Sequence, residues 1–414
     1  MAFRFIHAAD IHLDSPLLSL EEYPGAPLEE IRLATRKALA RLVDVAIESA
    51  VTFVVIAGDL FDGEWRDCNT GLYFVSEMKR LRAAGIPVYI SLGNHDAANR
   101  MTLVLPWGDN VHFFDHRKPE RVEAAGHEAT LYSQSFRSRH IAEDLTGAFP
   151  KGSAGTFNIG VLHTSATFSA GQELYAPCSL ESLRSHQYQY WALGHVHTRT
   201  ELAHEPWVVF SGNIQGRSVR ECGPRGCYLV DVDDHGGVSL DFQPLDVVRW
   251  EVLRLSVDDE TTGEGLEELA QQAISRTAAA AEGRTLALRF EIAGHGPAWN
   301  RAAADVAGWR ARLRALAGDT PVPVHVEKLV LVPQTGVMST SVDAGGAGEL
   351  NAMVKRFAED PALLEELRQT FGELKTKLEA AVTLGEECVD PQDAELLRRA
   401  LCAVEPLLLK GEGK

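Results

Sequence analysis

The sequence predicts an α/β fold, because short apolar strands alternate along it with amphipathic helices. The apolar runs FRFIHA, TFVVIA and IPVYISL have the length of strands, and TFVVIA is rich in β-branched residues. The segments between these runs carry apolar residues at helical spacing, as Leu39, Leu42, Val43 and Ala46 do. Strand, helix and strand in this order predict parallel pairing with crossover helices.

The elements of the first part of the chain follow one another in regular order. They are a strand at 3–8, a helix at 29–50, a strand at 52–57, a helix that ends at Ala84 and a strand at 86–92. Gly85 stands where a glycine commonly ends a helix. Three later apolar runs are predicted to continue the sheet, at 157–162, 190–193 and 207–210, and the pattern ends near Asp246.

A smaller α+β unit is predicted to follow. Its elements are a strand at 250–257, an alanine-rich helix, a strand at 285–292, a helix at 309–316 and a strand at 324–332. The polar, glycine-rich stretch PQTGVMSTSVDAGGAG then predicts a flexible linker. We therefore expect domains at 1–248 and 249–333, a linker at 334–349 and a helical region at 350–414.

The composition is that of an ordinary globular protein and limits the classes of function. The chain has 414 residues, enough for two or three domains, of which 45% are hydrophobic and 24% charged. It has no apolar run of about 18 residues and no secretory signal, and its scattered cysteines are typical of reduced thiols, so we expect a cytoplasmic protein without a membrane span. The net charge of −18 argues against a surface that binds nucleic acid over its whole extent, although it allows a local basic strip.

Polar side chains that can bind a metal follow five of the predicted strands, at the point where each strand ends. They are Asp10 and His12; Asp59 and Asp62; Asn94, His95 and Asp96; His163; and His195 and His197. In open α/β sheets, ligands bind outside the carboxyl ends of the strands, so these side chains are expected at one site. Residues two apart in an extended segment point to the same side, which lets both members of a pair such as Asp10 and His12 face that site.

A donor set of Asp, His and Asn without thiolates favours manganese, iron or zinc. Seven such ligands are too many for one tetrahedral ion and suit two ions that share a carboxylate. Two ions about 3.5–4 Å apart can bind a phosphate and activate a water for in-line attack. Each side chain alone has a structural explanation, as a loop cap for Asp10 or a turn for Asn94. These explanations need a separate cause at every strand end, which favours metal binding.

The ordered motifs DIH, GDLFD, GNHD, LHTS and GHVH resemble those of the calcineurin-like metallophosphoesterase superfamily, over residues 1–245. Within it, LGNHDAANRM and SGNIQGR are similar to the SbcD type of DNA double-strand-break repair nuclease, and most to its YhaO-like bacterial branch. The resemblance implies a β-sandwich flanked by helices, in four α/β/β/α layers. It also implies that the α+β domain is a capping domain and that the helical C-terminal tail binds a partner.

The resemblance further implies a role for each matching residue. The first metal would be held by Asp10, His12, Asp59 and His197, and the second by Asp59, Asn94, His163 and His195, with Asp59 as the bridge. His95 would be the catalytic histidine, which protonates the leaving oxygen or stabilises the transition state, and Asp96 would orient His95 by a hydrogen bond. Some relatives carry a histidine that assists exonuclease action where this chain has Asp62, which we interpret as a supporting group.

The resemblance implies a manganese-dependent phosphodiesterase that cleaves DNA in repair, as an exonuclease or an endonuclease, with a metal-activated water as the attacking group. A small-molecule phosphodiesterase or phosphomonoesterase on the same site is one alternative, and an inactive scaffold subunit is another, although the complete ligand set argues against the latter. Protein phosphatases carry GDxxDRG, whose phosphate-binding arginine is absent here because Gly63 follows Asp62. Candidate contacts to a DNA backbone, for which a solvated face is the alternative, are Arg137, Arg139, Arg217, Arg220, Arg225, and the cluster Arg117, Lys118 and Arg121.

The tail from residue 350 to 414 is predicted to bind a partner. One apolar seam recurs along it at spacings of three and four, formed by Leu364, Leu367, Phe371, Leu374, Leu378 and Ala381. The resemblance implies that this region docks an SMC-like coiled-coil ATPase. An exposed seam recruits a partner helix or self-associates, so a homodimer is an alternative, as is packing of these helices on one another or on the body of the protein.

Overall fold

The computed structural model describes residues 2–15, 27–62, 68–98, 105–124, 126, 128–165 and 176–333. The chain divides into two compact units, one formed by Met1–Glu251 with Arg284–Ala287 and the other by Val252–Gly283 with the chain from Leu288 onward. The predicted domain boundary between residues 248 and 249 remains a prediction. The linker predicted at 334–349 and the helical region predicted at 350–414 lie outside the described residues.

The first sheet has the strand order β12-β11-β1-β2-β3-β4. Its parallel strands are β1 (Phe3–Ala8), β2 (Phe53–Ala57), β3 (Val88–Ser91) and β4 (Val111–Phe113). Two strands pair antiparallel at the β1 side, β11 (Gly226–Val232) and β12 (Val238–Pro244). The crossovers between the parallel strands contain α1 (Leu28–Arg32), α2 (Ala34–Glu48) and α3 (Asn69–Ala83). The predicted alternation of strands and helices up to residue 92 is therefore confirmed.

The second sheet has the strand order β5-β6-β7-β8-β10-β9. Its parallel strands are β6 (Ala129–Ser133), β7 (Phe157–His163), β8 (Tyr190–Gly194) and β10 (Trp207–Phe210), with β5 (Glu120–Ala124) and β9 (Thr200–His204) antiparallel at the edges. The expectation that the apolar runs at 157–162, 190–193 and 207–210 continue the first sheet was wrong. A buried apolar run has the same pattern whether it lies in one sheet or another, so the sequence pattern alone does not separate the two.

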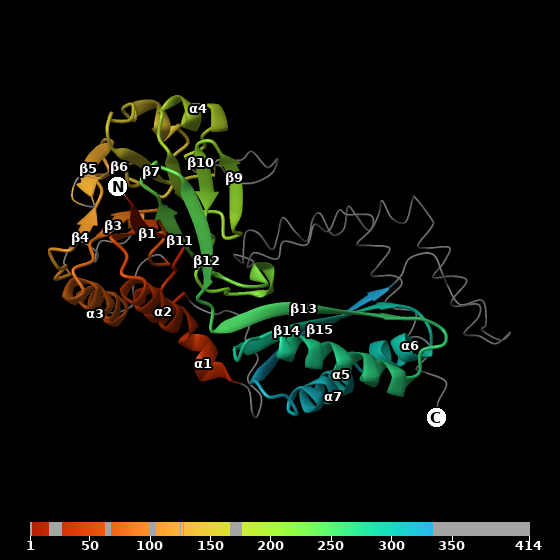
Figure 1. Ribbon diagram of the computed structural model, residues 1–414. Helices are drawn as coiled ribbons and strands as arrows, with labels where there is room; N and C mark the ends of the chain where they lie inside the picture. Colours follow the sequence, from red (N-terminus) through yellow and green to blue (C-terminus); the bar gives the residue numbers. More distant parts are fainter. Residues whose placement is uncertain are drawn as a thin grey trace. The chain divides into compact units, whose positions relative to one another are not determined.

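The two sheets pack face to face, and helices cover their outer faces (Figure 1). Neighbouring residues of β1 point to opposite sides, so that Ile6 packs with Leu42 of α2 while Phe5 packs with Val161 of the second sheet. On the far face of the second sheet, Trp191 lies in a cluster with residues of α4 (Leu180–Ser185) and the short helix η4 (Leu145–Ala148). This arrangement confirms the four α/β/β/α layers.

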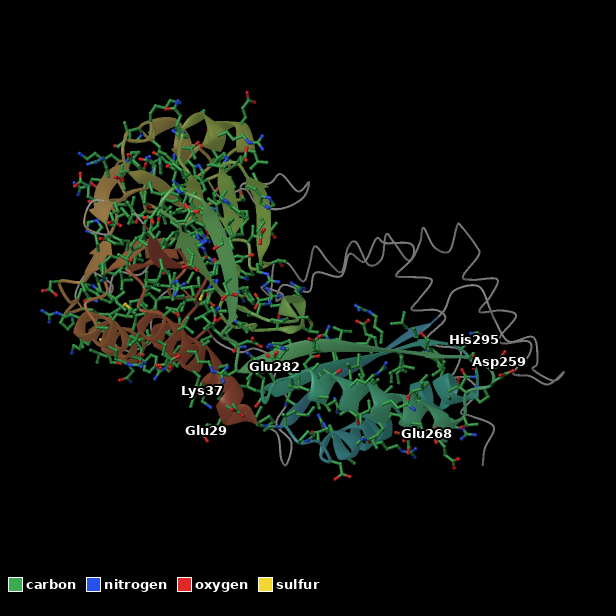
Figure 2. The ribbon with its side chains drawn as sticks, in the orientation of Figure 1. Glu29, Lys37, Asp259, Glu268, Glu282 and His295 are labelled. Atoms are coloured by element: carbon green, nitrogen blue, oxygen red, sulfur yellow. The ribbon has the colours of Figure 1, made fainter. Side chains whose placement is uncertain are left out.

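The third sheet has the order β13-β14-β15, formed by β13 (Val248–Val257), β14 (Thr285–Gly294) and β15 (Val324–Pro333). The helices of the second unit are α5 (Gly263–Ala279), α6 (Pro297–Ala304) and α7 (Val306–Ala317). Asp259 and His295 lie beyond the ends of β13 and β14 (Figure 2). Nε2 of His295 is 3.7 Å from Oδ2 of Asp259. None of the helices in the described part of the chain has the length and apolar character needed to cross a membrane.

Candidate metal centre

The residues of the candidate centre lie at the carboxyl ends of parallel strands. Asp10 and His12 follow β1; Asp59 and Asp62 follow β2; Asn94, His95 and Asp96 follow β3; His163 ends β7; and His195 and His197 follow β8. The loops after β1 and β2 are tied together, because the amides of Asp10 and His12 donate to the carbonyls of Gly58 and Asp59. Interactions between side chains join all five strand ends, so the structure brings the predicted residues to one place.

Four of the predicted ligands have a backbone conformation that side chains rarely adopt. The φ angles are 51° at Asp10, 43° at His12, 50° at Asp59 and 98° at His195. A positive φ at a residue other than glycine costs on the order of 1–3 kcal/mol and persists only where the surroundings impose it. In the described part of the chain nine residues other than glycine have a positive φ, and four of them are side chains that the sequence assigns to the metals, which is consistent with a functional site.

Two glycines make room for ligands that come from other strands. A Cβ atom on Gly58 would lie 2.2 Å from Nδ1 of His163, and one on Gly93 would lie 2.2 Å from Oδ1 of Asp59. Gly58 also has a φ of 94°, which favours glycine for a second reason. Each glycine therefore determines whether a side chain of a neighbouring strand can reach the centre.

His163, Asn94 and Asp59 converge on one point. Nε2 of His163 lies 2.9 Å from Oδ1 of Asn94 and 3.2 Å from Oδ2 of Asp59. The other nitrogen, Nδ1, lies 3.0 Å from the carbonyl of Ala57, to which it donates when the ring is neutral. In that state the lone pair of Nε2 faces two oxygen acceptors, an arrangement that a metal cation between them would stabilise. The ring of His195 lies beside it, with its centroid 5.2 Å from that of His163.

Asp10, His12 and His197 form a second group of possible metal ligands. The Nε2 atoms of His12 and His197 lie 3.2 Å apart, and Oδ1 of Asp10 lies 3.9 Å from Nε2 of His197. Oδ2 of Asp59 lies 3.9 Å from Nε2 of His12. The same carboxylate oxygen lies close to His163, so it is adjacent to both groups of ligands. This position matches the bridging role that the resemblance implies for Asp59. The Asp10 carboxylate also accepts the amide of His195 at 3.0 Å.

The electrostatics of these buried groups fit two divalent cations. Burial lowers the pKa of His12, and lowers the pKa of His195 to about 3, so both rings are neutral and have lone pairs to donate. Burial also lowers the pKa of His163, but the Asp59 carboxylate outweighs it and raises the value to about 9. A proton thus occupies the position in which a metal ion would compensate the carboxylate. Among the described residues, Nδ1 of His12 is buried and has no hydrogen-bond partner.

Four partly exposed side chains border the buried ligands, and we call them the rim: Asp62, His95, His197 and Arg217. Their side chains are 23%, 29%, 26% and 20% exposed, whereas those of Asp10, His12, Asp59 and His163 are at most 2% exposed. On the rim, Nδ1 of His95 lies 2.7 Å from Oδ1 of Asp62. This hydrogen bond raises the pKa of His95 and holds the pKa of Asp62 below its usual range. His12, Asp62 and His95 also form a third group with metal-ligand spacing, which was not predicted.

The partner predicted for His95 is wrong. Asp96 accepts the amides of Leu60, Phe61 and Gly93 at 3.0–3.1 Å, and in the described residues no contact joins it to the His95 ring. The reason is local geometry, because Asp96 begins the short helix η1 (Asp96–Ala98) and its carboxylate turns back to the loop after β2. Asp62 takes the predicted place beside His95, and Asp96 joins the two ligand loops instead.

Two further residues at the centre were not predicted as part of it. Oε1 of Glu221 lies 2.6 Å from Nδ1 of His197, so this carboxylate fixes the ring with Nε2 toward the ligands. Burial raises the pKa of Glu221, but the bond to His197 and the charge of Arg217 hold it below its usual range. Arg217 precedes the short helix η5 (Val219–Glu221), and its guanidinium contacts both Glu221 and His197. The sequence signal for this segment was SGNIQGR, which carries no metal-ligand pattern.

The arginines proposed to contact DNA differ in their surroundings. Arg225 is buried and donates to the Asn213 side chain and to backbone carbonyls, so it is a structural residue of the first unit. Arg137 pairs with Glu143 at 3.0 Å, and Arg121 pairs with Glu123 at 2.9 Å. Arg139 is exposed, and its charge lowers the pKa of His95 against the larger effect of Asp62.

Comparison with known sequences identifies the family. Residues 3–199 match the profile of the calcineurin-like phosphoesterases, and residues 250–332 match that of the middle domain of metallophosphoesterase YhaO. The uncharacterized metallophosphoesterase YhaO of Bacillus subtilis is 32% identical over 299 residues, which cover 71% of this chain and 72% of that protein. The chain belongs to the calcineurin-like metallophosphoesterase family. It is accordingly a metal-dependent phosphoester hydrolase with a dinuclear site for divalent metals.

More distant relatives of this metallophosphoesterase include proteins named DNA double-strand break repair protein Mre11. That of Methanopyrus kandleri is 25% identical over 300 residues, covering 66% of this chain and 62% of that protein. That of Sulfurisphaera tokodaii is 27% identical over 211 residues, covering 46% and 52%. The chain thus spans less than two thirds of the length of both. Among solved structures, a dimetal phosphatase from Danio rerio aligns with a TM-score of 0.38 and 14% identity, over 59% of this chain and 96% of that one.

Proposed function

We propose that this metallophosphoesterase is a manganese-dependent phosphodiesterase that cleaves DNA. The observation that carries the proposal is the shared position of Asp59 between two donor groups, with the His95–Asp62 pair on the exposed side of both. The two Mre11 relatives support DNA as the substrate class. The donor set of carboxylates, imidazoles and one amide supports manganese, which accepts oxygen and nitrogen ligands together.

Two bound metal ions supply the charge that binds a phosphate and lowers the pKa of a water. His95, on the rim, supplies the proton that the leaving oxygen of the phosphodiester needs. Nδ1 of His95 donates to Asp62, and this bond raises the pKa of the ring, which favours the form that also carries a proton on Nε2. That proton can pass to the leaving oxygen of the phosphodiester. Glu221 orients His197 so that Nε2 faces the buried ligands.

A phosphomonoesterase or small-molecule phosphodiesterase is the alternative on the same residues. The exposed rim favours it in one respect, because the described residues close to the centre include only a few cations for a long polyanion. A decisive experiment incubates the purified full chain and manganese with end-labelled linear DNA, bis(p-nitrophenyl) phosphate and p-nitrophenyl phosphate. The proposal expects DNA cleavage that is absent in Asp59→Asn. Hydrolysis of the small esters without cleavage of any DNA would assign the alternative, and hydrolysis of none would favour a scaffold.

We also propose that residues 350–414 dock an SMC-like coiled-coil ATPase. Support comes from the apolar seam in the sequence, in which Leu367 and Leu374 are seven residues apart, the spacing of two turns in a predicted helix. Changing both to Glu in the full chain is expected to abolish co-purification with a co-expressed SMC-like ATPase, while hydrolysis of bis(p-nitrophenyl) phosphate persists. Unchanged co-purification would refute this docking site.

A further inference from the structure

Among the described residues, the rim is the exposed part of the centre. Asp10, His12, Asp59 and His163 are covered, whereas Asp62, His95, His197 and Arg217 keep a fifth or more of their side chains in solvent. Of these four, Arg217 is the permanent cation. A phosphate that approaches the buried ligands therefore passes a guanidinium that none of the metal-ligand motifs contains.

The guanidinium of Arg217 is held only loosely by its neighbours. Its Nη2 lies 3.2 Å from Glu221 and 3.3 Å from Nδ1 of His197. Its Nη1 lies 3.4 Å from Oγ of Ser15 and 3.7 Å from Oδ2 of Asp62. Within the described residues, its Nε has no hydrogen-bond partner.

An arginine that forms a two-bond ion pair elsewhere in the protein has shorter contacts. Arg289 forms a fork with Glu327 at 2.7 and 2.8 Å, within the usual range for charge-assisted bonds. The contacts of Arg217 are about half an ångström longer or more, and they are spread over several partners. Arg217 thus keeps donor capacity that a phosphate oxygen can use.

The guanidinium is also dispensable for holding Glu221. The backbone amide of Arg217 donates to Oε2 of Glu221 at 2.7 Å, and Nδ2 of Asn213 donates to the same oxygen at 2.9 Å. His197 therefore keeps its orienting carboxylate when the Arg217 side chain is shortened.

We propose that Arg217 binds a non-bridging oxygen of the scissile phosphate and is the substrate-positioning cation of this centre. It takes the place of the arginine that is missing after Asp62, where the chain has Gly63. The guanidinium reaches the same Asp62 carboxylate from the segment that precedes η5. The proposal rests on the proposed phosphodiester chemistry of this site, although it does not require DNA as the substrate.

The test measures phosphate binding directly. Inorganic phosphate is titrated into the manganese-loaded full chain by calorimetry, and its inhibition constant and the KM for bis(p-nitrophenyl) phosphate are determined in parallel. Arg217→Gln is expected to weaken phosphate binding and raise KM by roughly 10- to 100-fold, the range of a charge-assisted hydrogen bond, with manganese content unchanged. Arg217→Lys is expected to recover part of the loss, because it keeps the charge but not the fork. Arg137→Gln, which removes a surface arginine paired with Glu143, is the matched control.

Unchanged phosphate affinity in Arg217→Gln would overturn the proposal. So would a loss of manganese in parallel with activity, because Arg217 would then only support His197. If the wild-type chain hydrolyses no diester, the proposed function fails while the calorimetric comparison still decides the role of Arg217.

Discussion

The buried ligands and the rim of the centre are held in place in different ways. The ligands Asp10 and Asp59, and Asp96 beside them, accept backbone amides from neighbouring loops, so the fold itself sets their positions. On the rim, His95 is held by Asp62 and His197 by Glu221, which are side chains rather than backbone. The difference suggests a division of labour. We expect the buried carboxylates to hold the metals, together with His197, whereas the pair of His95 and Asp62 on the rim can be changed without disturbing them.

The largest effect is expected where the two donor groups meet. Asp59→Asn removes the negative charge that lies beside both groups of ligands, so both metal sites should weaken and activity should be lost. Elemental analysis for manganese and the hydrolysis rate are measured on the same preparation. A variant that retains full activity would contradict the shared role of Asp59.

His95→Asn tests whether the rim is separable from the buried ligands. Turnover should fall by about 10²- to 10⁴-fold, the usual contribution of a general acid or base, while manganese content stays the same. Loss of manganese together with activity would place His95 among the ligands, as its grouping with His12 and Asp62 permits.

Asp62 and Asp96 can be compared directly, because Asp62 bonds to a side chain of the rim whereas Asp96 bonds to buried backbone amides. Asp96→Asn keeps one acceptor oxygen but replaces the other by an NH2 group, so at least one of the three buried amides loses its acceptor, at a cost of about 2–3 kcal/mol in the free energy of unfolding. Asp62→Asn removes the charge that raises the pKa of His95 and weakens the bond to its ring, so it should lower turnover with little change in stability. Urea denaturation and steady-state kinetics of both variants check this. The reverse pattern would restore Asp96 as the partner of His95.

The smallest effect is expected beyond the rim. If Arg139 contacts a DNA phosphate, Arg139→Gln should weaken DNA binding a few-fold and lower the slope of log K against log salt by about one. Arg137→Gln should change neither, because its charge is already paired with Glu143. Fluorescence anisotropy of labelled DNA at several salt concentrations measures both, and equal effects would indicate a diffuse charge effect.

The sequence predicted the place of the centre better than its internal contacts. Strand ends could be located because β1, β2 and β3 are short apolar runs followed directly by polar residues. The partner of His95 could not, because adjacency in sequence favours Asp96 whereas the turn into η1 directs that side chain to other amides. Glu221 was missed because it lies far from His197 along the chain and only the folded loop brings it close.

The glycines beside the ligands have a consequence for any attempt to graft this centre onto another scaffold. Gly58 leaves space for His163, and Gly93 leaves space for Asp59, so each glycine serves a ligand that another strand delivers. The motifs are therefore not independent parts. A design that copies one strand end at a time would contain the donor side chains but not the space that they need. A single alanine at either glycine would displace a ligand that the sequence still contains.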